Sequence, residues 1–222
     1  MFKVKPYTPY SFLPLFLFLL FTLLLTSLGV QAQSINTKQP PAEFIQTLAN
    51  QTLKVVKDDK AAQAGDRSAV ERLVDQHVLP YVDFEKTTRL ATGRYWRDAS
   101  TSQRTNLVNA FKNTLIRTYS GSLNNVENLS AINVGPFRGD PEAKDVVVRS
   151  TVVQKNGPAV GVDYRMENTP SGWKIYDLNV EGIWLIQNYR NQFAQVISQK
   201  GIDGLIEILK NQSMHVDTKQ NT

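Results

Sequence analysis

Few side chains in this 222-residue sequence have the types and spacing that catalysis or metal binding requires. The chain has no cysteine and two histidines, His77 and His215, and neither lies in a paired metal-ligand spacing such as H-E-x-x-H. The sequence contains no G-x-S-x-G elbow, no P-loop and no G-x-G-x-x-G after a strand. Asp177 and Glu181 remain as acid–base candidates, although isolated carboxylates are usually solvated or paired. We therefore assign no catalytic residue and expect no metal and no cofactor.

Four arginines lie within sixteen residues and are interleaved with two aromatic residues. The cluster consists of Arg89, Arg94, Tyr95, Trp96, Arg97 and Arg104. Guanidinium groups suit phosphate and carboxylate oxygens, because their N–H groups form a planar fork. The cluster is either a solvated surface with an aromatic anchor or a contact for anionic headgroups or an acidic partner. We take Arg89, Arg94, Trp96 and Arg97 as the candidate contact residues.

The composition favours a folded domain, since 41% of the residues are hydrophobic and 20% are charged. The formal net charge is +5. Lys3 and Lys5 belong to an expected leader, and without them 23 basic and 20 acidic residues leave +3. This excess is too small for the clustered basic stripe of a nucleic-acid-binding protein. We expect no nucleic acid as a partner, and we expect a monomer.

The first 32 residues have the pattern of a signal peptide. Lys3 and Lys5 precede an uncharged apolar stretch, 11–28, and Val30-Gln31-Ala32 is a small-residue cleavage pattern. The expected domain boundaries are therefore a leader over 1–32, one domain over 33–211 and a polar tail over 212–222. An uncleaved membrane anchor is the alternative, because the apolar stretch is just long enough to span a bilayer. Either leader predicts export, and a cleaved one predicts the periplasm of a two-membrane bacterium.

Helical periodicity frames the mature sequence at both ends. Four helices are expected first: from Pro40-Pro41 to Asp58, from a Ser68-x-x-Glu71 capping box to Pro80, from Asp83 to Gly93, and from a Ser100-x-x-Gln103 capping box to Gly121. The helical period returns from Trp184 to Ile197, breaks at Gly201 and resumes in a last short helix around 205–209.

A period of two residues indicates about four antiparallel strands in the middle of the chain. The expected strands are Val126 to Phe137, Asp145 to Lys155, Ala159 to Glu167 and Trp173 to Val180. In the third strand, Val160, Val162, Tyr164 and Met166 should share an apolar face, opposite a polar one. Helices followed by strands and helices, without parallel crossovers, predict an α+β fold.

The apolar residues on the fourth helix and on the strands have two interpretations. They fill an ordinary core, or they leave an apolar pocket open between the helices and a curved sheet. Periodicity alone does not separate the two.

The sequence resembles the MlaC family of toluene-tolerance (Ttg2-type) proteins. The resemblance rests on an ordered set of short segments that covers residues 42–210. They are Val78-Leu-Pro-Tyr-Val-Asp83, Gly93-Arg-Tyr-Trp96, Val162-Asp-Tyr-Arg165, Gly172-Trp-Lys-Ile-Tyr-Asp177, Val180-Glu-Gly182, Asn188-Tyr-Arg-Asn-Gln-Phe193 and Gly201-Ile-Asp-Gly-Leu205. Trp184 departs from the pattern, because a small polar residue is expected there.

The resemblance implies a periplasmic carrier that binds phospholipid by its acyl chains and helps to maintain outer-membrane lipid asymmetry. It implies a nuclear-transport-factor-2-like sheet with helices around it. It also implies two partners, an outer-membrane lipoprotein complex and the substrate-binding subunit of an inner-membrane ABC transporter. The expected lining consists of Leu107, Phe111, Leu115, Val148, Val160, Val162, Tyr164 and Ile175. A small enzyme with a carboxylate in an apolar pocket, with Asp177 as its first candidate, and a protein that binds no lipid are the alternatives.

Overall fold

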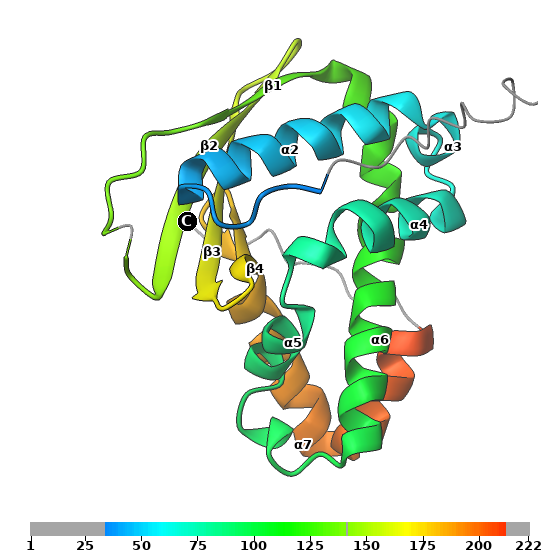
Figure 1. Cartoon of the computed structure of the whole chain (residues 1–222). Coiled ribbons are helices and arrows are strands. Elements are labelled where there is room, and N and C mark those ends of the chain that lie inside the picture. The colour runs from blue at the N-terminus through cyan, green and yellow to red at the C-terminus, as the bar shows by residue number, and fades with distance from the viewer. Residues whose placement is uncertain (1–33, 141, 212–222) are drawn as a thin grey trace, which may run out of the picture. The chain divides into compact units, whose positions relative to one another are not determined.

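The computed structural model describes residues 34–140 and 142–211. The expected leader and the polar tail lie outside the described residues. The described chain has an α+β fold with one antiparallel sheet, which follows the first helices in the sequence and precedes α7, while α7 packs against α5 and α6 (Figure 1). This arrangement confirms the fold class that the sequence predicts.

The helices before the sheet follow the expected order, with short 3-10 turns between them. They are α2 (Pro41–Asp58), α3 (Lys60–Gln63), α4 (Arg67–His77), η2 (Leu79–Tyr81), α5 (Phe84–Thr92), η3 (Gly93–Trp96), α6 (Thr101–Tyr119) and η4 (Ser120–Asn128). Ser100 and Gln103 form the predicted reciprocal capping box at the start of α6. The predicted cap of α4 at Ser68 is wrong. Asp66 caps this helix instead, and its carboxylate accepts the N–H of Ala69 at 2.8 Å.

The sheet is a five-stranded meander in the order β1-β2-β3-β4-β5. Its strands are β1 (Leu129–Val134), β2 (Asp145–Gln154), β3 (Val160–Thr169), β4 (Gly172–Val180) and β5 (Ile183–Trp184). The prediction of about four strands misses β5, because a two-residue strand has no period to detect. The expected strand from Val126 is shorter in the structure, since Val126 belongs to η4.

The last helix, α7 (Leu185–Asn211), bends sharply at Gly201. Gly201 has φ +69°, which lies in the left-handed region that a glycine adopts at low cost. The predicted helix break at this residue is therefore confirmed.

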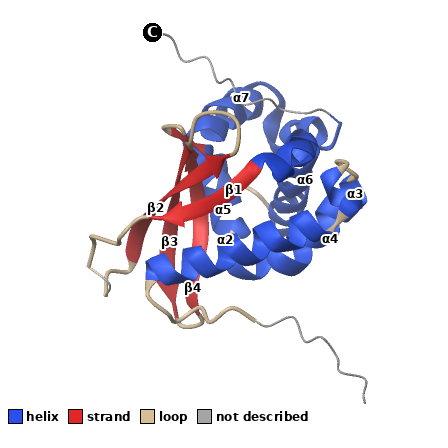
Figure 2. Cartoon of the chain, turned by 90° about the horizontal axis from the view of Figure 1, so that it is seen from above, coloured by secondary structure: helices blue, strands red, loops and turns tan. Residues whose placement is uncertain are grey.

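Helix α2 extends from the sheet to α3 and α4 (Figure 2). Its Gln46 side chain ties it to β1, because it donates to the carbonyl of Ile132 and accepts the N–H of Val134. Phe44 and Ile45, in the first half of α2, pack on one end of the sheet. A second core lies among α5, α6 and α7, and a third lies under η4.

Candidate functional site

The two faces of the sheet differ sharply in chemistry. Strand pairing places Val162 opposite Val180 and places Tyr164 between Val148 and Leu178, so these residues share one face. On the opposite face, Arg165 of β3 pairs with Asp177 of β4. The alternation along β3 therefore produces one apolar and one polar face, as the sequence predicts.

One end of the apolar face is fully covered. Val148, Met166 and Ile175 are buried there under Phe44 and Ile45 of α2. Most side chains at this end are packed as in an ordinary protein core.

The other end of the apolar face is open. Leu178 is 36% exposed and Val180 is 47% exposed, although both side chains lie on the apolar side of the sheet. Their cross-strand partners on β3, Val162 and Tyr164, are half-buried. Exposed apolar side chains at this end of the apolar face indicate a surface that the chain's own side chains do not fully cover.

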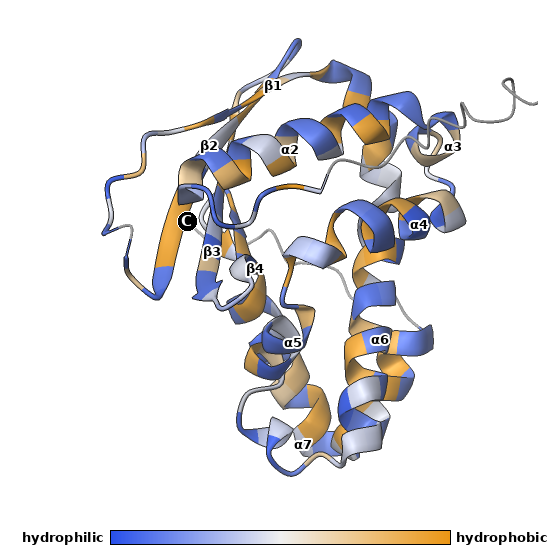
Figure 3. Cartoon of the chain, in the orientation of Figure 1, coloured by the Kyte–Doolittle hydropathy of each residue, from blue (hydrophilic) through white to orange (hydrophobic). Residues whose placement is uncertain are grey.

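The end of α6 carries a further exposed aromatic residue. Tyr119, the last residue of α6, is 40% exposed, and Leu115, one turn earlier, is half-buried. Tyr119 forms a side-chain hydrogen bond with Tyr189 of α7, a residue that is itself buried. Because α7 follows directly after β4 and β5, this bond holds the end of α6 near the edge of the sheet where Val180 lies. The hydrophobic residues of α6 form a strip along the helix (Figure 3).

Burial also changes the chemistry of the tyrosines in this region. Tyr164 lies on the apolar face, and its hydroxyl is 3.4 Å from Ser150 Oγ. Burial raises the pKa values of both Tyr164 and Tyr119 above the ordinary value, so both phenols are neutral near pH 7. The open region therefore carries no charged side chain from these two residues.

The structure separates the eight side chains that the sequence places in one lining. Leu107 and Phe111 are buried among the helices, where the Phe111 ring lies 4.8 Å from Tyr189 and 5.0 Å from Phe193. Val148 and Ile175 are buried under α2. The other four are half-buried: Val160, Val162 and Tyr164 lie on the apolar face of β3, whereas Leu115 packs against the core of α5, α6 and α7.

Sequence reasoning missed Leu178, Val180 and Tyr119. The cause on β4 is an irregularity in the pairing with β3, where Arg165 lies opposite Asp177 but Met166 lies opposite Ile175. The extra residue reverses the alternation after Ile175 and turns Leu178 and Val180 to the apolar face. Leu178 and Val180 are recognised only from this shift in strand register, and the sequence pattern does not indicate the shift.

Asp177, the first candidate for acid–base chemistry, is fully engaged on the polar side of the sheet. Its carboxylate lies 3.0 Å from Arg165 Nη1 and accepts the N–H groups of Leu178 and Ile186, each at 3.0 Å. Burial raises the pKa of Asp177, although the two N–H donors and Arg165 oppose the increase. The Arg165 guanidinium also lies 3.7 Å from the centre of the Trp184 ring. These contacts join β4 to the start of α7, and they explain how a tryptophan is accommodated at position 184.

The arginine cluster lies around η3, at the connection between α5 and α6. Arg89, Arg94 and Arg97 are exposed. Trp96 is only 7% exposed and packs in the core of α5, α6 and α7, so its ring is not available as the surface contact that the sequence predicts. Arg104 reaches back and donates to the carbonyl of Trp96 at 3.1 Å.

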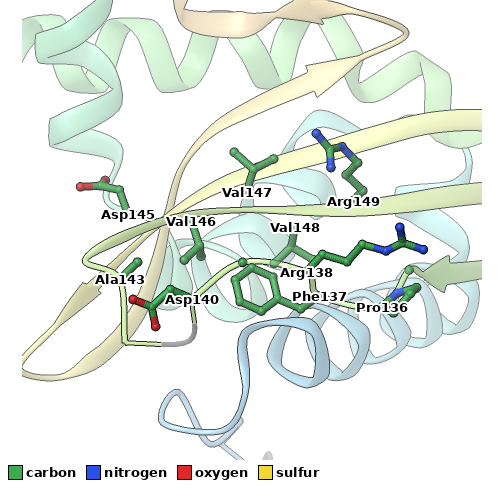
Figure 4. A pocket seen from close by; sticks show the side chains of 12 residues that line it. Pro136, Phe137, Arg138, Asp140, Ala143, Asp145, Val146, Val147, Val148 and Arg149 are labelled. Carbon is green, nitrogen blue, oxygen red and sulfur yellow. The ribbon is translucent and has the colours of Figure 1, made fainter.

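A separate pocket of about 590 Å³ lies between the β1–β2 connection and the first half of β2 (Figure 4). Phe137, Val146 and Val148 contribute apolar lining, whereas Arg138 and Asp145 make its rim charged. This mixed lining differs from the open apolar region around Leu178 and Val180.

Two further observations bear on the kind of site. Within residues 34–140 and 142–211, no three His, Asp or Glu side chains are grouped so that they could hold a metal ion. In the same part of the chain, no helix is both long and apolar enough to span a bilayer. The described chain does expose apolar side chains, Leu178 and Val180, on the apolar face of the sheet.

Comparison with known proteins identifies the family. The sequence model of the MlaC protein family matches residues 46–211, and the chain therefore belongs to this family. A solved structure of a phospholipid-binding protein from Ralstonia solanacearum, in complex with a phospholipid, is 43% identical and has a TM-score of 0.72. The match covers 76% of this chain and 94% of that chain.

Two curated relatives agree with this assignment. The intermembrane phospholipid transport system binding protein MlaC of Haemophilus influenzae is 23% identical over 192 residues, which cover 85% of this chain and 89% of the relative. The toluene tolerance protein ttg2D of Pseudomonas putida is 27% identical over 166 residues, which cover 74% of this chain and 76% of the relative.

Proposed function

We propose that this protein binds a phospholipid by its acyl chains and carries it between two membranes through the periplasm. The observation that carries the proposal is the exposure of Leu178 (36%) and Val180 (47%) on the apolar face of the sheet. The phospholipid bound to the Ralstonia solanacearum relative supports the same class of ligand.

The energetics of lipid transfer explain why a carrier is needed. Each methylene exposed to water costs about 0.8 kcal/mol, so two acyl chains with about thirty methylenes cost about 24 kcal/mol. The apolar side chains around Val162, Val180 and Leu115 replace water around these chains. The phosphate headgroup stays at the solvent-exposed edge of the site, because burying it without partners costs several kcal/mol.

We propose that partly exposed side chains on the sheet and at the end of α6 contact the lipid. The proposed contacts are Leu115, Tyr119, Val160, Val162, Tyr164, Leu178 and Val180. Leu107, Phe111, Val148 and Ile175 support these residues from the packed cores, and they contact a lipid only if α2 or α7 moves. No step in this mechanism breaks or forms a covalent bond.

The proposal includes two partners and one cellular location. After export through its leader, the monomeric carrier receives or delivers lipid at an outer-membrane lipoprotein complex and at the substrate-binding subunit of an inner-membrane ABC transporter. Its work would maintain the lipid asymmetry of the outer membrane.

The proposal is tested by organic extraction of the full chain expressed and exported in bacteria, followed by mass spectrometry. We expect about one or two phospholipid molecules for each folded protein. Folded protein without stoichiometric phospholipid would refute the proposal.

A further inference from the structure

The helical end of the molecule carries a group of exposed arginines that the lipid site does not use. We define the arginine surface as Arg89, Arg94, Arg97 and Arg190. Among the described residues, none of these four side chains forms an ion pair. From 87 to 111 the sequence contains four arginines and no lysine.

Hydrogen bonds to the backbone join the parts of this surface. Arg190 of α7 donates to the carbonyl of Leu90, in the last turn of α5, at 2.9 Å. Arg104 of α6 donates to the carbonyl of Arg97 at 3.3 Å. These two bonds attach Arg190 of α7 to the end of α5, and Arg104 of α6 to the turn after η3, although 100 positions separate Leu90 from Arg190 in the sequence.

Part of the surface is held in place before any partner binds. Arg94 donates to the Tyr95 hydroxyl at 3.0 Å, and its guanidinium lies 4.9 Å from the centre of that ring. Arg190 is fixed by the Leu90 carbonyl. Side chains that are already fixed lose less entropy when they bind, which favours a specific contact over a diffuse one.

Nearby carboxylates offset this charge only in part, although Asp98 attracts the Arg94 guanidinium. Glu85 and Asp98 are exposed near Arg89 and Arg94, and neither forms an ion pair within the described part of the chain. Asp203, on the neighbouring part of α7, accepts from the Gln103 amide instead. The surface therefore keeps an excess of positive charge that attracts an anionic partner.

The chemistry of the surface favours a protein over a membrane. The exposed large hydrophobic residues are Tyr119, Val147, Leu178 and Val180, and all of them lie on the sheet or at the far end of α6. Trp96, the aromatic residue at the centre of the arginine surface, is buried. A membrane-surface site usually combines basic residues with apolar side chains that enter the lipid, and the arginine surface provides only the basic residues.

We propose that the arginine surface docks a partner protein through a surface rich in aspartate and glutamate. Arginine forks pair with carboxylates in bidentate geometry. In Figure 1 the α5–α6 connection lies at the bottom of the view and the β2–β3 hairpin lies at the top. A partner bound at the α5–α6 connection therefore leaves the open apolar face accessible. The inference rests on the proposed function, because it specifies how one transport partner is recognised.

The test compares two triple variants with the same loss of charge. R89Q/R94Q/R97Q removes three arginines and leaves Arg104 and Arg190 on their carbonyl acceptors. K38Q/K54Q/K155Q removes three exposed lysines elsewhere on the chain. The probes are the purified periplasmic region of the inner-membrane binding subunit and vesicles of phosphatidylglycerol and phosphatidylcholine. Binding is measured by titration at several salt concentrations, and bound phospholipid is measured in parallel by mass spectrometry.

We expect the arginine variant to bind the periplasmic region at least about tenfold more weakly than the lysine variant at low salt, with a smaller difference at high salt. Both variants should keep the wild-type lipid content. Equal binding by the two variants, or no binding by the wild type, would overturn the inference. A loss confined to the vesicles would also overturn it, because it would indicate a membrane contact. Absence of bound lipid in the wild type would refute the proposed function alone.

Discussion

Arg165 and Asp177 form an ion pair in which the carboxylate is completely shielded from solvent, with Nη1 and Oδ2 3.0 Å apart. The same carboxylate accepts the N–H of Ile186, the second residue of α7. The pair therefore connects β3, β4 and the last helix, and its role in the structure is architectural.

Replacement of Asp177 should destabilise the fold and leave lipid binding by the folded protein intact. D177A leaves the Arg165 charge and two N–H groups without their acceptor, and we expect the free energy of unfolding to fall by about 3 kcal/mol. The control is D163A, because Asp163 forms an exposed and longer pair, 3.9 Å, with Arg149 and should cost about 0.5 kcal/mol or less. Urea unfolding, monitored by circular dichroism, gives the free energy of unfolding of both variants. Equal midpoints for the two variants would show that the Arg165–Asp177 pair does not support the fold.

The open apolar face can be tested with two residues of nearly equal exposure. Leu178 is 36% exposed on the apolar face, and Val147 is 37% exposed on the polar face. We expect L178D to reduce bound phospholipid about tenfold, because a buried carboxylate next to acyl chains costs several kcal/mol. V147D should keep the wild-type lipid content. The same lipid content in L178D as in V147D would place the lipid elsewhere.

Gly172 should tolerate no side chain. Its φ is +96°, and a Cβ atom there would overlap Thr37 Oγ1 and the Thr37 carbonyl. That carbonyl accepts the N–H of Trp173 at 2.8 Å and holds the segment before α2 against β4. We expect G172A to lower the free energy of unfolding by about 2 kcal/mol, measured by thermal unfolding, whereas G121A, where nothing lies near the added atom, should cost less. A G172A protein as stable as G121A would contradict this contact.

Glu167 should contribute to stability in a pH-dependent way. Its carboxylate lies 2.6 Å from Lys86 Nζ and 3.2 Å from Lys144 Nζ. The hydrogen bond from Lys86 lowers the pKa of Glu167 below its ordinary value. A folded-state pKa below the unfolded value means that this stabilisation is complete above about pH 4.5 and is lost as the pH falls through the folded-state pKa.

The E167Q variant tests this pH dependence. It should be less stable than wild type by about 1 kcal/mol at pH 7 and nearly equal at pH 3. The control is E127Q, because Glu127 pairs only loosely with the exposed Lys60, at 3.4 Å. Unfolding curves at both pH values provide the comparison. If E167Q and wild type differ in free energy of unfolding by the same amount at pH 3 and at pH 7, the ion pairs of Glu167 are not the source of the pH dependence.

The sequence was sufficient where a local pattern determines local structure. The capping box at Ser100, the break at Gly201 and the alternation along β3 each depend on a few neighbouring residues, and each is confirmed. The candidate site was predicted less well, because its lining depends on which elements meet. Phe111 and Val162 both fit an apolar stripe, but only the first is closed off by aromatic neighbours from α7.

Two errors have the same physical origin. Leu178 was missed because one extra residue in β4 reverses the strand alternation. Trp96 was predicted to be a surface anchor because arginines surround it in the sequence, yet its ring turns inward while Arg104 holds its carbonyl. In both cases tertiary packing, which leaves no periodic signal, determines which way the side chain points.

The most direct test of acyl-chain binding is photo-crosslinking with a phospholipid that carries a diazirine in its acyl chain, followed by mapping of the modified residues by mass spectrometry. We predict that the crosslinks fall on Val162, Leu178, Val180 and Leu115. Crosslinks concentrated between Phe137 and Arg149, in the pocket beside β2, would contradict the account.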